Sequence, residues 1–275
     1  MEKYIDMVSC NLIGQQGNQM FTICATLSYA LRNGLEYHIP AHTLNDSVWK
    51  PMFTHLENPK WNPELPTYIL KENQHNYQEL PTEIKSSTFL GDVLIDKQKV
   101  NIIIDGYRQS LLYFEDYLPE VRKAFGFTYT PIYSLTAALH IRLGDYRFYP
   151  TKHPVVSNVY LMFAITEMLE RGISHFVVFS DEIYEAKKII EDLNISSLCQ
   201  FRYSEGKSEK EDFQEMLYCS HFIISNSTYS LMAAILSESP NKIVISPDES
   251  NWFGSGNAHL DVSDLIPKEY IRIKY

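Results

Sequence analysis

The chain has 275 residues, of which 45% are hydrophobic and 21% charged, and this composition is typical of a globular protein and not of a disordered one. Its length predicts one large α/β domain or two domains of moderate size. The formal net charge of −10 argues against nucleic acid and anionic membranes as partners, since both bind proteins through clustered positive charge. A small anionic ligand remains compatible, because it needs only a local basic pocket.

The cysteines and the N-terminus indicate the compartment. The four cysteines are far apart in the sequence, and each lies in an apolar run, which favours buried free thiols in a reducing environment: Cys10, Cys24, Cys199 and Cys219. Residues 1–14 lack the layout of a signal peptide, and no window approaches the ~20 apolar residues of a membrane span. We therefore expect a cytoplasmic protein without a membrane span.

The first 130 residues predict an α/β arrangement that proline interrupts. An apolar run at 5–13 predicts a strand, and the periodic run at 18–32 predicts a helix that Asn33 and Gly34 stop. Six prolines break residues 40–100 into short pieces. A buried strand is expected at 101–105, and a helix at 110–125 that ends at Gly126.

The second half alternates short apolar strands with helices. We expect strands at 136–141, 175–179, 198–201, 221–224 and 242–245, and helices at 157–171, 182–193, 209–219 and 228–237. This alternation predicts a parallel, Rossmann-like sheet with helices on both faces. Pro131 suggests a division into domains 1–130 and 131–275. The segment from 248 on carries Trp252 and Phe253 and is a candidate for packing back on the first domain.

Polar residues follow three of the predicted strands of the second half. Arg142 and Asp145 follow the first strand, Ser180 and Asp181 the second, and the segment 225–227 the fourth. Ligands of parallel α/β sheets bind at the carboxyl ends of the strands. These polar residues are therefore candidates for one binding site.

A glycine-rich segment, Gly14 to Gln19, lies between the first predicted strand and helix. Backbone N–H groups at such a position can hold a phosphate, helped by the helix dipole. The same residues also suit a tight turn in which Asn18 is the N-cap of the helix. The pattern alone leaves both interpretations open.

The segment from His140 to Tyr146 contains the second candidate anion site. Arg142 can bind a diphosphate with two nitrogens, and Asp145 can orient its guanidinium. The alternative is a structural Arg–Asp ion pair in a loop. Arg147, Lys152 and His153 make this loop basic within an acidic chain, which favours the anion site.

Two further segments suit either helix capping or nucleotide binding. Short polar side chains at helix starts accept hydrogen bonds from backbone N–H groups, and the same atoms can contact phosphate or ribose. We expect one residue of each segment to cap and another to face the ligand: Ser180 and Asp181 in the first, and Asn226, Ser227, Thr228 and Ser230 in the second.

Several chemistries lack their usual signatures. The sequence has no D-x-D motif that would bridge a nucleotide to a cation, and no metal site is predicted. It also has no G-x-S-x-G and no H-E-x-x-H motif. His55 and His75 lie alone in irregular sequence and are expected to be structural or surface residues. A general base is not defined, since nothing singles out one candidate: His42, Asp46 or Asp105.

Together these motifs resemble the inverting α-1,2-fucosyltransferases of glycosyltransferase family eleven. The segment from Gly14 to Thr22 resembles their signature G-G-L-G-N-Q-M-F-Q, and His140 to Tyr146 matches their motif H-x-R-x-G-D-Y in full. Further motifs follow in the family's order: His153-Pro154 and Tyr160, Ser180-Asp181-Glu182, then Asp212, Met216 and Cys219, the segment 226–234, and Pro247 with Trp252-Phe253. The chain departs from the pattern at Gln15 and Gln16, at Glu182, and at Leu231 and Met232, which replace two tryptophans.

The resemblance implies a GT-B-like fold, in which two Rossmann-like lobes with parallel sheets have the active site in the cleft between them. It implies GDP-fucose as donor substrate, no cofactor or metal, and a galactose-containing glycan as acceptor. The first lobe would present the acceptor and the second would bind GDP-fucose. Another GDP-sugar or linkage, or a nucleotide-sugar-binding protein that has lost activity, are the alternatives.

The resemblance also assigns roles to the candidate residues. The catalytic residues it implies are Arg142, Asn18 and Asp145. The residues it implies for donor binding are Gly14, Gly17, Asn18, Gln19, His140, Arg142, Ser180, Asp181, Asn226, Ser227, Thr228 and Ser230.

Overall fold

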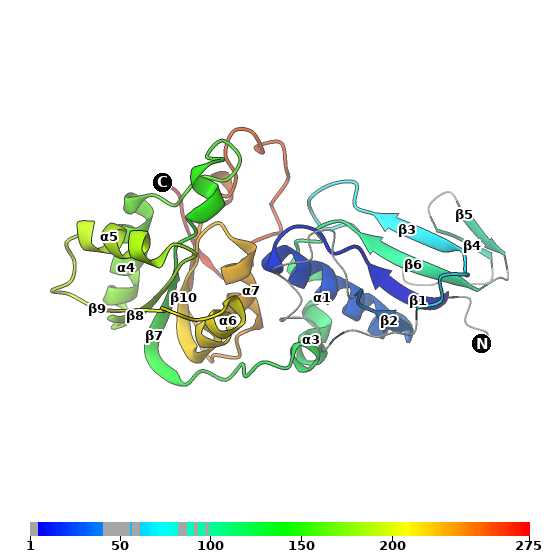
Figure 1. Ribbon diagram of the computed structural model, residues 1–275, viewed down its shortest axis with the longest axis horizontal. Coiled ribbons are helices and arrows are strands. Elements are labelled where there is room, and N and C mark those ends of the chain that lie inside the picture. Colours follow the sequence, from blue (N-terminus) through cyan, green and yellow to red (C-terminus); the bar gives the residue numbers. More distant parts are fainter. Residues whose placement is uncertain (1–4, 41–55, 57–60, 82–86, 91–92, 97–98) are drawn as a thin grey trace. The chain divides into compact units, whose positions relative to one another are not determined.

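A computed structural model of the protein describes residues 5–40, 56, 61–81, 87–90, 93–96 and 99–275. The chain divides into two compact units, Met1–Gly126 and Phe127–Tyr275. Each contains its own parallel sheet (Figure 1). These two sheets confirm the predicted α/β class with two Rossmann-like lobes.

The sheet of the first unit has the strand order β2-β1-β6-β3. Its strands are β1 (Ile5–Cys10), β2 (Glu36–His38), β3 (Thr67–Lys71) and β6 (Val100–Asp105). All three pairings are parallel, with Val8 opposite Tyr37 on one side and Ile102 on the other. The central strands β1 and β6 were predicted because they are apolar runs. Strands β2 and β3 were not, since they are short and partly exposed.

Helix α1 (Gln16–Asn33) supplies much of the core of the first unit. Its residues from Met20 to Ala30 are buried without interruption, so the helix is enclosed on nearly all sides. Gly34 ends it in the left-handed conformation with φ 60°, as the sequence predicts. The helix begins two residues earlier than expected, with Gln15 as N-cap and no side-chain cap bond. The interpretation of Asn18 as N-cap is therefore wrong, because Asn18 lies inside the first turn.

The predicted helix at 110–125 is shorter in the structure. Two 3₁₀ turns, η2 (Leu111–Tyr113) and η3 (Glu115–Tyr117), precede α3 (Leu118–Phe125). Pro119 lies in the first turn of α3, where its missing N–H is tolerated, and it could not continue a helix begun at Ser110. Strands β4 (Ser87–Leu90) and β5 (Val93–Asp96) form a separate antiparallel pair. The residues His42, Asp46 and His55 lie outside the described part of the chain.

The sheet of the second unit has the order β12-β11-β10-β7-β8-β9, and all its pairings are parallel. Its strands are β7 (Tyr133–His140), β8 (His175–Phe179), β9 (Gln200–Tyr203), β10 (Cys219–Ile223), β11 (Val244–Pro247) and β12 (Ile271–Ile273). All but β12 were predicted. The chain leaves β7 toward β8 on one side and later returns to β10 on the other, so the strand order reverses between β7 and β10.

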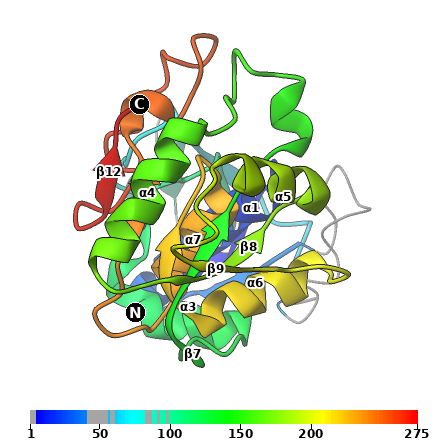
Figure 2. The ribbon, with the colours of Figure 1, turned by 90° about the vertical axis from the view of Figure 1, so that its left-hand side faces the viewer.

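Four helices cover this sheet. Figures 1 and 2 show α4 (Asn158–Glu170) and α5 (Ile183–Asp192) on one face, and α6 (Glu209–Tyr218) and α7 (Thr228–Leu236) on the other. Right-handed crossovers to strands on opposite sides of β7 require this distribution. Ser157 caps α4, and Ser208 with Glu211 forms a capping box on α6, so these boundaries follow local sequence.

The C-terminal segment packs within the second unit. Trp252 is buried at 2% exposure, β12 pairs with β11, and the Asn251 side chain donates to the carbonyl of Tyr275 over 2.8 Å. Gly254 and Gly256 donate their backbone N–H groups to the carbonyls of Lys152 and Thr151. These contacts join the segment to the loop that follows β7.

Candidate functional site

The carboxyl ends of β7 and β10 form the centre of the candidate site in the second unit. These strands are neighbours, and the strand order reverses between them, which is where open α/β sheets bind ligands. His140 ends β7, and Ser225 and Asn226 follow β10. The His140 Nδ1 and the Ser225 Oγ lie 2.7 Å apart and join the two strand ends.

Arg142 lies between two carboxylates beside this point. Its Nε and Nη2 donate to Asp145 Oδ1 over 3.1 and 2.7 Å, and its Nη1 lies 3.2 Å from Asp181 Oδ2. The guanidinium also lies over the Tyr146 ring, 5.6 Å from its centroid. The Arg142 side chain is 21% exposed, so a ligand at the edge of the sheet can reach a group that the protein holds in place.

The charges around Arg142 keep it protonated. Burial alone would lower the pKa of its guanidinium, but the carboxylates of Asp181 and Asp145 outweigh that effect and raise the pKa. Arginine is thus a permanent cation here, unlike a buried lysine, whose pKa shifts readily. The ion pair with Asp145, one of the two interpretations from the sequence, is present and leaves part of the cation exposed, while the anion site stays a prediction.

Asp181 has a role that sequence reasoning missed. It does not cap α5, whose N-cap is Glu182. Its Oδ1 accepts from the backbone N–H of Leu143 over 2.9 Å, while its other oxygen faces Arg142. A Cβ at Gly144 would lie 2.2 Å from Asp181 Oδ2, so glycine is needed for this approach. Asp181 therefore fixes both the backbone and the side chain of the loop after β7.

His140 is a buried neutral ring. Burial, together with the nearby positive charge of Arg142, lowers its pKa to about 3. Its ring lies 5.8 Å from that of Tyr229 in α7. A neutral histidine here can exchange a hydrogen bond with a ligand or with Ser225, but it carries no charge to attract an anion.

The polar residues after β10 either make structural hydrogen bonds or lie at the start of α7. The Asn226 Nδ2 donates to the carbonyls of Pro154 and Trp252, both over 2.9 Å, so this amide ties three segments together. Ser227 is the N-cap of α7 and makes no side-chain cap bond, while Ser230 Oγ donates to the Ser227 carbonyl over 3.2 Å. Thr228 is the first residue of the helix. The first turn of α7 therefore directs its backbone N–H groups toward the carboxyl edge of the sheet.

Ser180 closes a turn of its own. Its Oγ accepts from the backbone N–H of Glu182 over 3.1 Å, which starts the approach to α5. This contact is close to the capping role that the sequence suggested. Glu182 itself pairs with Arg147 over 2.6 Å.

Tyr146 and His153 line the same loop. The Tyr146 hydroxyl donates to the carbonyl of Asn226 over 2.9 Å, and its ring stacks on His153 with centroids 5.0 Å apart. Burial lowers the pKa of His153. The matched motif therefore places Tyr146 as a brace between the loop after β7 and the loop after β10.

The glycine-rich loop belongs to the first unit. Gly14 has φ 68°, and a Cβ there would lie 2.4 Å from Asn18 Nδ2, so both conformation and space require glycine. Gln19 is buried, and its Nε2 donates to the Gly14 carbonyl over 3.1 Å, which closes the loop. Gly17 and Asn18 lie in the first turn of α1. The candidate residues of this unit thus form one compact loop at a helix start.

The sequence did not predict the series of side-chain hydrogen bonds that reaches this loop at Asn18. Gln109 is buried, and its Nε2 donates to Asn18 Oδ1 over 2.8 Å. Its Oε1 lies 3.1 Å from the Nε2 of His75. His75 thus has a defined polar contact, although the sequence gave no signal for it, since the three residues are far apart in the chain.

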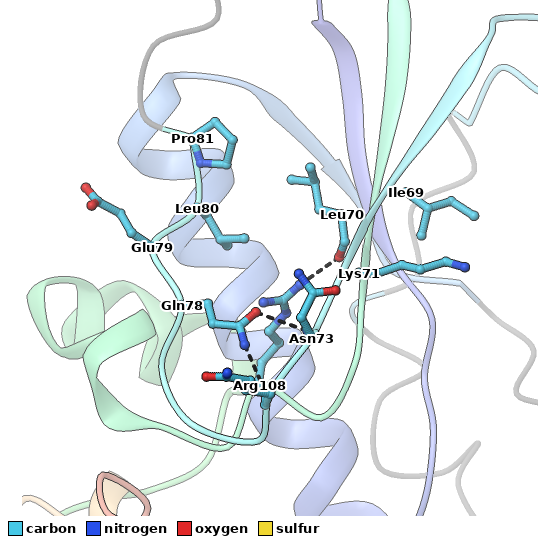
Figure 3. Close-up of a pocket in the computed structure, with 10 residues that line it drawn as sticks. Ile69, Leu70, Lys71, Asn73, Gln78, Glu79, Leu80, Pro81 and Arg108 are labelled. Atoms are coloured by element: carbon cyan, nitrogen blue, oxygen red, sulfur yellow. Dashed lines mark hydrogen bonds between the residues drawn. The ribbon is translucent and has the colours of Figure 1, made fainter. Parts of the chain in front are cut away.

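A pocket of about 600 Å³ also lies in the first unit. In Figure 3, Ile69 and Lys71 lie on one side of it and Leu80 and Pro81 on the other. Asn73, Gln78 and Glu79 add polar groups, and the buried Arg108 donates to the Leu70 carbonyl over 2.7 Å. The lining combines aliphatic surface with amide and carboxyl groups.

The described part of the chain contains neither a candidate metal-binding cluster nor a candidate membrane-spanning helix. In that part of the chain no three His, Cys, Asp or Glu side chains gather in a way that could hold a metal ion. Nor does it contain a helix long and apolar enough to cross a membrane. Metal independence stays a prediction from the sequence.

Comparison with known proteins defines the class. Residues 2–255 match the model of glycosyl transferase family 11. The chain therefore belongs to this family, which confirms the resemblance seen in its sequence and makes it a glycosyltransferase.

Individual relatives are more distant. The chain is 34% identical over 126 residues to the O-antigen biosynthesis glycosyltransferase WbnK of Escherichia coli, and this match covers 44% of the chain and 40% of WbnK. Among solved structures, POFUT1 in complex with GDP-fucose is 12% identical, with 89% of this chain and 98% of that one covered and a TM-score of 0.48. FUT1 of Arabidopsis thaliana in complex with GDP is 12% identical, with coverages of 91% and 74% and a TM-score of 0.49.

Proposed function

We propose that the protein transfers L-fucose from GDP-fucose to a hydroxyl group of a terminal galactoside, with O2 as the expected position. Transfer inverts the anomeric carbon, so β-linked GDP-fucose gives an α-linked product. Membership in family 11 supports this proposal, and so does the held guanidinium of Arg142 at the ligand-binding edge of a Rossmann-like sheet.

The chemistry requires stabilisation of the leaving group. As the acceptor oxygen attacks C1 of fucose, the bond from C1 to the β-phosphate breaks and negative charge grows on that phosphate. A fixed cation and backbone N–H groups aimed at the charge stabilise such a transition state without a large reorganisation. In the proposal Arg142 supplies the cation, and the first turn of α7 supplies N–H groups.

Asp145 and Asp181 orient the cation in this proposal. Together they hold three of its nitrogens through contacts of 3.2 Å or less, so the plane of the guanidinium is set before the donor binds. Orientation in advance reduces the entropy lost on binding. The two carboxylates also leave a local excess of negative charge, so the diphosphate must compete with them for the Arg142 nitrogens.

Replacement of Arg142 tests the proposal. We expect Arg142→Ala to lower kcat by about 10²–10³-fold or more, the usual cost of losing one preorganised charge-stabilising group. Initial rates with GDP-fucose measure this, and circular dichroism checks the fold. Arg171→Ala is the matched control, since Arg171 pairs with Glu167 at the far end of α4. Near-normal turnover by Arg142→Ala would show that Arg142 does not stabilise the leaving group.

Chelation tests the role of metal. Because no step in the proposal uses a cation other than arginine, we expect the initial rate to be unchanged in excess EDTA. Rates are compared with and without EDTA, and again after Mg²⁺ or Mn²⁺ is restored. A strict requirement for either ion contradicts the metal-independent mechanism.

The acceptor is proposed from the family and from the role of WbnK in O-antigen biosynthesis, which makes a surface polysaccharide or oligosaccharide the expected product. The amide and carboxyl groups around the pocket of the first unit suit sugar hydroxyls, which favours this unit as the acceptor side. Incubation with GDP-fucose and a panel of β-galactosides, followed by linkage analysis, identifies the product. A parallel reaction with GDP-mannose separates the proposal from transfer of another sugar.

A further inference from the structure

Asn226 lies where three segments of the second unit meet. It follows β10 and is 2% exposed. Its Nδ2 donates to the Pro154 carbonyl at the end of the loop after β7 and to the Trp252 carbonyl of the C-terminal segment, each over 2.9 Å. Two carbonyl oxygens can only accept, so the NH₂ group of the amide must face them. Both hydrogens of the side chain are therefore used within the protein.

The main chain of Asn226 holds the turn that carries Asp145. The Tyr146 hydroxyl donates to the Asn226 carbonyl over 2.9 Å. Tyr146 and Asp145 are neighbours in the 3₁₀ turn η4 (Gly144–Arg147), and Asp145 Oδ1 accepts from two nitrogens of Arg142 over 3.1 and 2.7 Å. The Tyr146 ring also lies 5.6 Å from the Arg142 Cζ, measured to the ring centroid. Asn226 is thus linked to the Arg142 guanidinium through Tyr146.

The C-terminal segment contacts the same loop at a second place. A Cβ at Gly254 would lie 2.3 Å from the Thr151 carbonyl oxygen, so glycine is needed for this approach. The His153 ring stacks on Tyr146 with centroids 5.0 Å apart and meets the Phe253 ring edge-on with centroids 5.5 Å apart. The loop that bears Tyr146 is therefore packed against the segment to which the Asn226 amide is bonded.

We propose that Asn226 is a positioning residue that fixes Tyr146 and, through Tyr146 and Asp145, sets the Arg142 guanidinium for the β-phosphate of the donor. The inference rests on the proposed function, in which Arg142 stabilises that phosphate. All four residues belong to the second unit. A direct bond from the Asn226 side chain to phosphate would need an amide hydrogen, and its Oδ1, which is buried without a hydrogen-bond partner, would repel an anion.

Asn226→Ala tests the inference by comparing two nucleotides. We expect GDP affinity to fall by about ten-fold, since an ordinary hydrogen bond contributes about two- to ten-fold and the amide makes two. The affinity for GMP is expected to stay unchanged, because GMP lacks the β-phosphate that Arg142 faces in the proposal. A direct contact between Asn226 and the nucleoside predicts equal losses for both nucleotides.

Tyr146→Phe interrupts the same link at its other end. This change keeps the ring beside Arg142 and removes only the hydroxyl that donates to the Asn226 carbonyl. We expect GDP affinity to fall by about two- to ten-fold and GMP affinity to stay unchanged. A protein with both changes is expected to lose little more than Asn226→Ala alone, because residues that act through one another are not additive.

Asn101→Ala is the matched control. Asn101 is fully buried, and its Nδ2 donates to the Asn62 carbonyl over 2.7 Å. Its Oδ1, like that of Asn226, is buried without a hydrogen-bond partner. It lies near the amino end of β6, whereas ligands of parallel sheets bind at the carboxyl ends. We expect this change to lower stability and to leave the affinities for GDP and GMP unchanged.

Calorimetric titration with GDP and with GMP gives the readout, and urea unfolding shows whether each variant is folded. If the unchanged protein does not bind GDP, or if Arg142→Ala binds GDP normally, the proposed function fails. If Arg142→Ala loses GDP affinity but Asn226→Ala and Tyr146→Phe do not, the inference alone fails. Equal losses of GDP and GMP affinity in Asn226→Ala also overturn it. Tyr146→Phe decides the question if Asn226→Ala does not fold.

Discussion

Arg142 shows how the surroundings of one residue define its chemistry. An arginine followed three residues later by an aspartate is a common surface ion pair, which contributes little stability. Here a second carboxylate, that of Asp181, comes from the segment after β8 and lies 3.2 Å from the remaining guanidinium nitrogen. The motif predicts the pair with Asp145, but the contact with Asp181 depends on the pairing of β7 with β8.

The pKa of His140 makes stability depend on pH. The folded protein keeps this ring neutral, with its pKa lowered to about 3 from 6.5, chiefly by burial. Between these values the unfolded chain binds the extra proton, so the free energy of unfolding falls as the pH falls. The stability is present above pH 6.5 and is lost progressively toward pH 3, with a slope of up to about 1.4 kcal/mol per pH unit.

Urea unfolding at several pH values between 7.5 and 5 measures this contribution. In His140→Gln we expect the free energy of unfolding to depend less steeply on pH, because glutamine does not titrate and the contribution of the histidine is lost. His175→Gln is the control, because His175 lies exposed at the start of β8 and is expected to leave the slope unchanged. Equal slopes for the unchanged protein and His140→Gln would contradict the assignment of a neutral buried ring.

At the scale of elements, local sequence signals succeeded where strands were apolar and helices had caps. The strands β8, β10 and β11 and the second half of β7 are mostly buried, and their apolar runs identify them. Strand β3 alternates between exposed and half-buried positions, which gives a weak apolar signal, although it pairs with β6 along its full length. Its formation depends on a neighbour about 35 residues away, and composition does not encode that.

In the candidate site, too, only residues with a local sequence signal could be predicted. The Gly14–Asn18 loop and the segment after β7 were recognisable because they follow predicted strands and resemble motifs of the family. Gln109 and His75 were not, since an isolated amide or histidine has no local signature. Leu231 and Met232, which replace the family's two tryptophans, are both fully buried in α7, so this departure alters the core and not an exposed surface.

Tyr160 joins helix α4 to the ends of two strands. Its buried hydroxyl donates to the Ile224 carbonyl over 2.5 Å and lies 3.2 Å from the Ile245 carbonyl. Tyr160→Phe removes this donor and leaves buried carbonyls with a lost partner, so we expect a loss of about 1–3 kcal/mol in the free energy of unfolding. Thermal and urea unfolding measure it.

The control for this prediction is Tyr184→Phe in α5. Tyr184 is 74% exposed, and removing its hydroxyl is expected to change stability by less than about 0.5 kcal/mol. Equal stability of the Tyr160→Phe and Tyr184→Phe proteins would show that the buried hydroxyl does not hold the strand ends.

For the whole molecule, the important feature is that each unit has a separate core. Apolar residues of α1, β1 and β6 fill the first unit, and residues of β7, β8, α4 and α5 form a cluster in the second. Each unit has its own closed set of strand pairings, with no sheet shared between them among the described residues. Units of this size with their own cores commonly unfold separately.

Unfolding in urea is therefore expected to show two transitions. In a protein with Trp49 and Trp61 replaced by Phe, the fluorescence of Trp252 reports the unfolding of the second unit, in which it is buried. In a second protein, with Trp49 and Trp252 replaced, the fluorescence of Trp61 reports the unfolding of the first unit. Since the proposal puts Arg142 in the second unit, GDP at about 100 times its Kd is expected to stabilise the Trp252 transition by about 2.7 kcal/mol through mass action. The Trp61 transition is expected to stay in place. Fluorescence at each midpoint, with and without GDP, measures both shifts. One coincident transition for both reporters would mean that the two units unfold together, and a larger shift at Trp61 would place GDP mainly on the first unit.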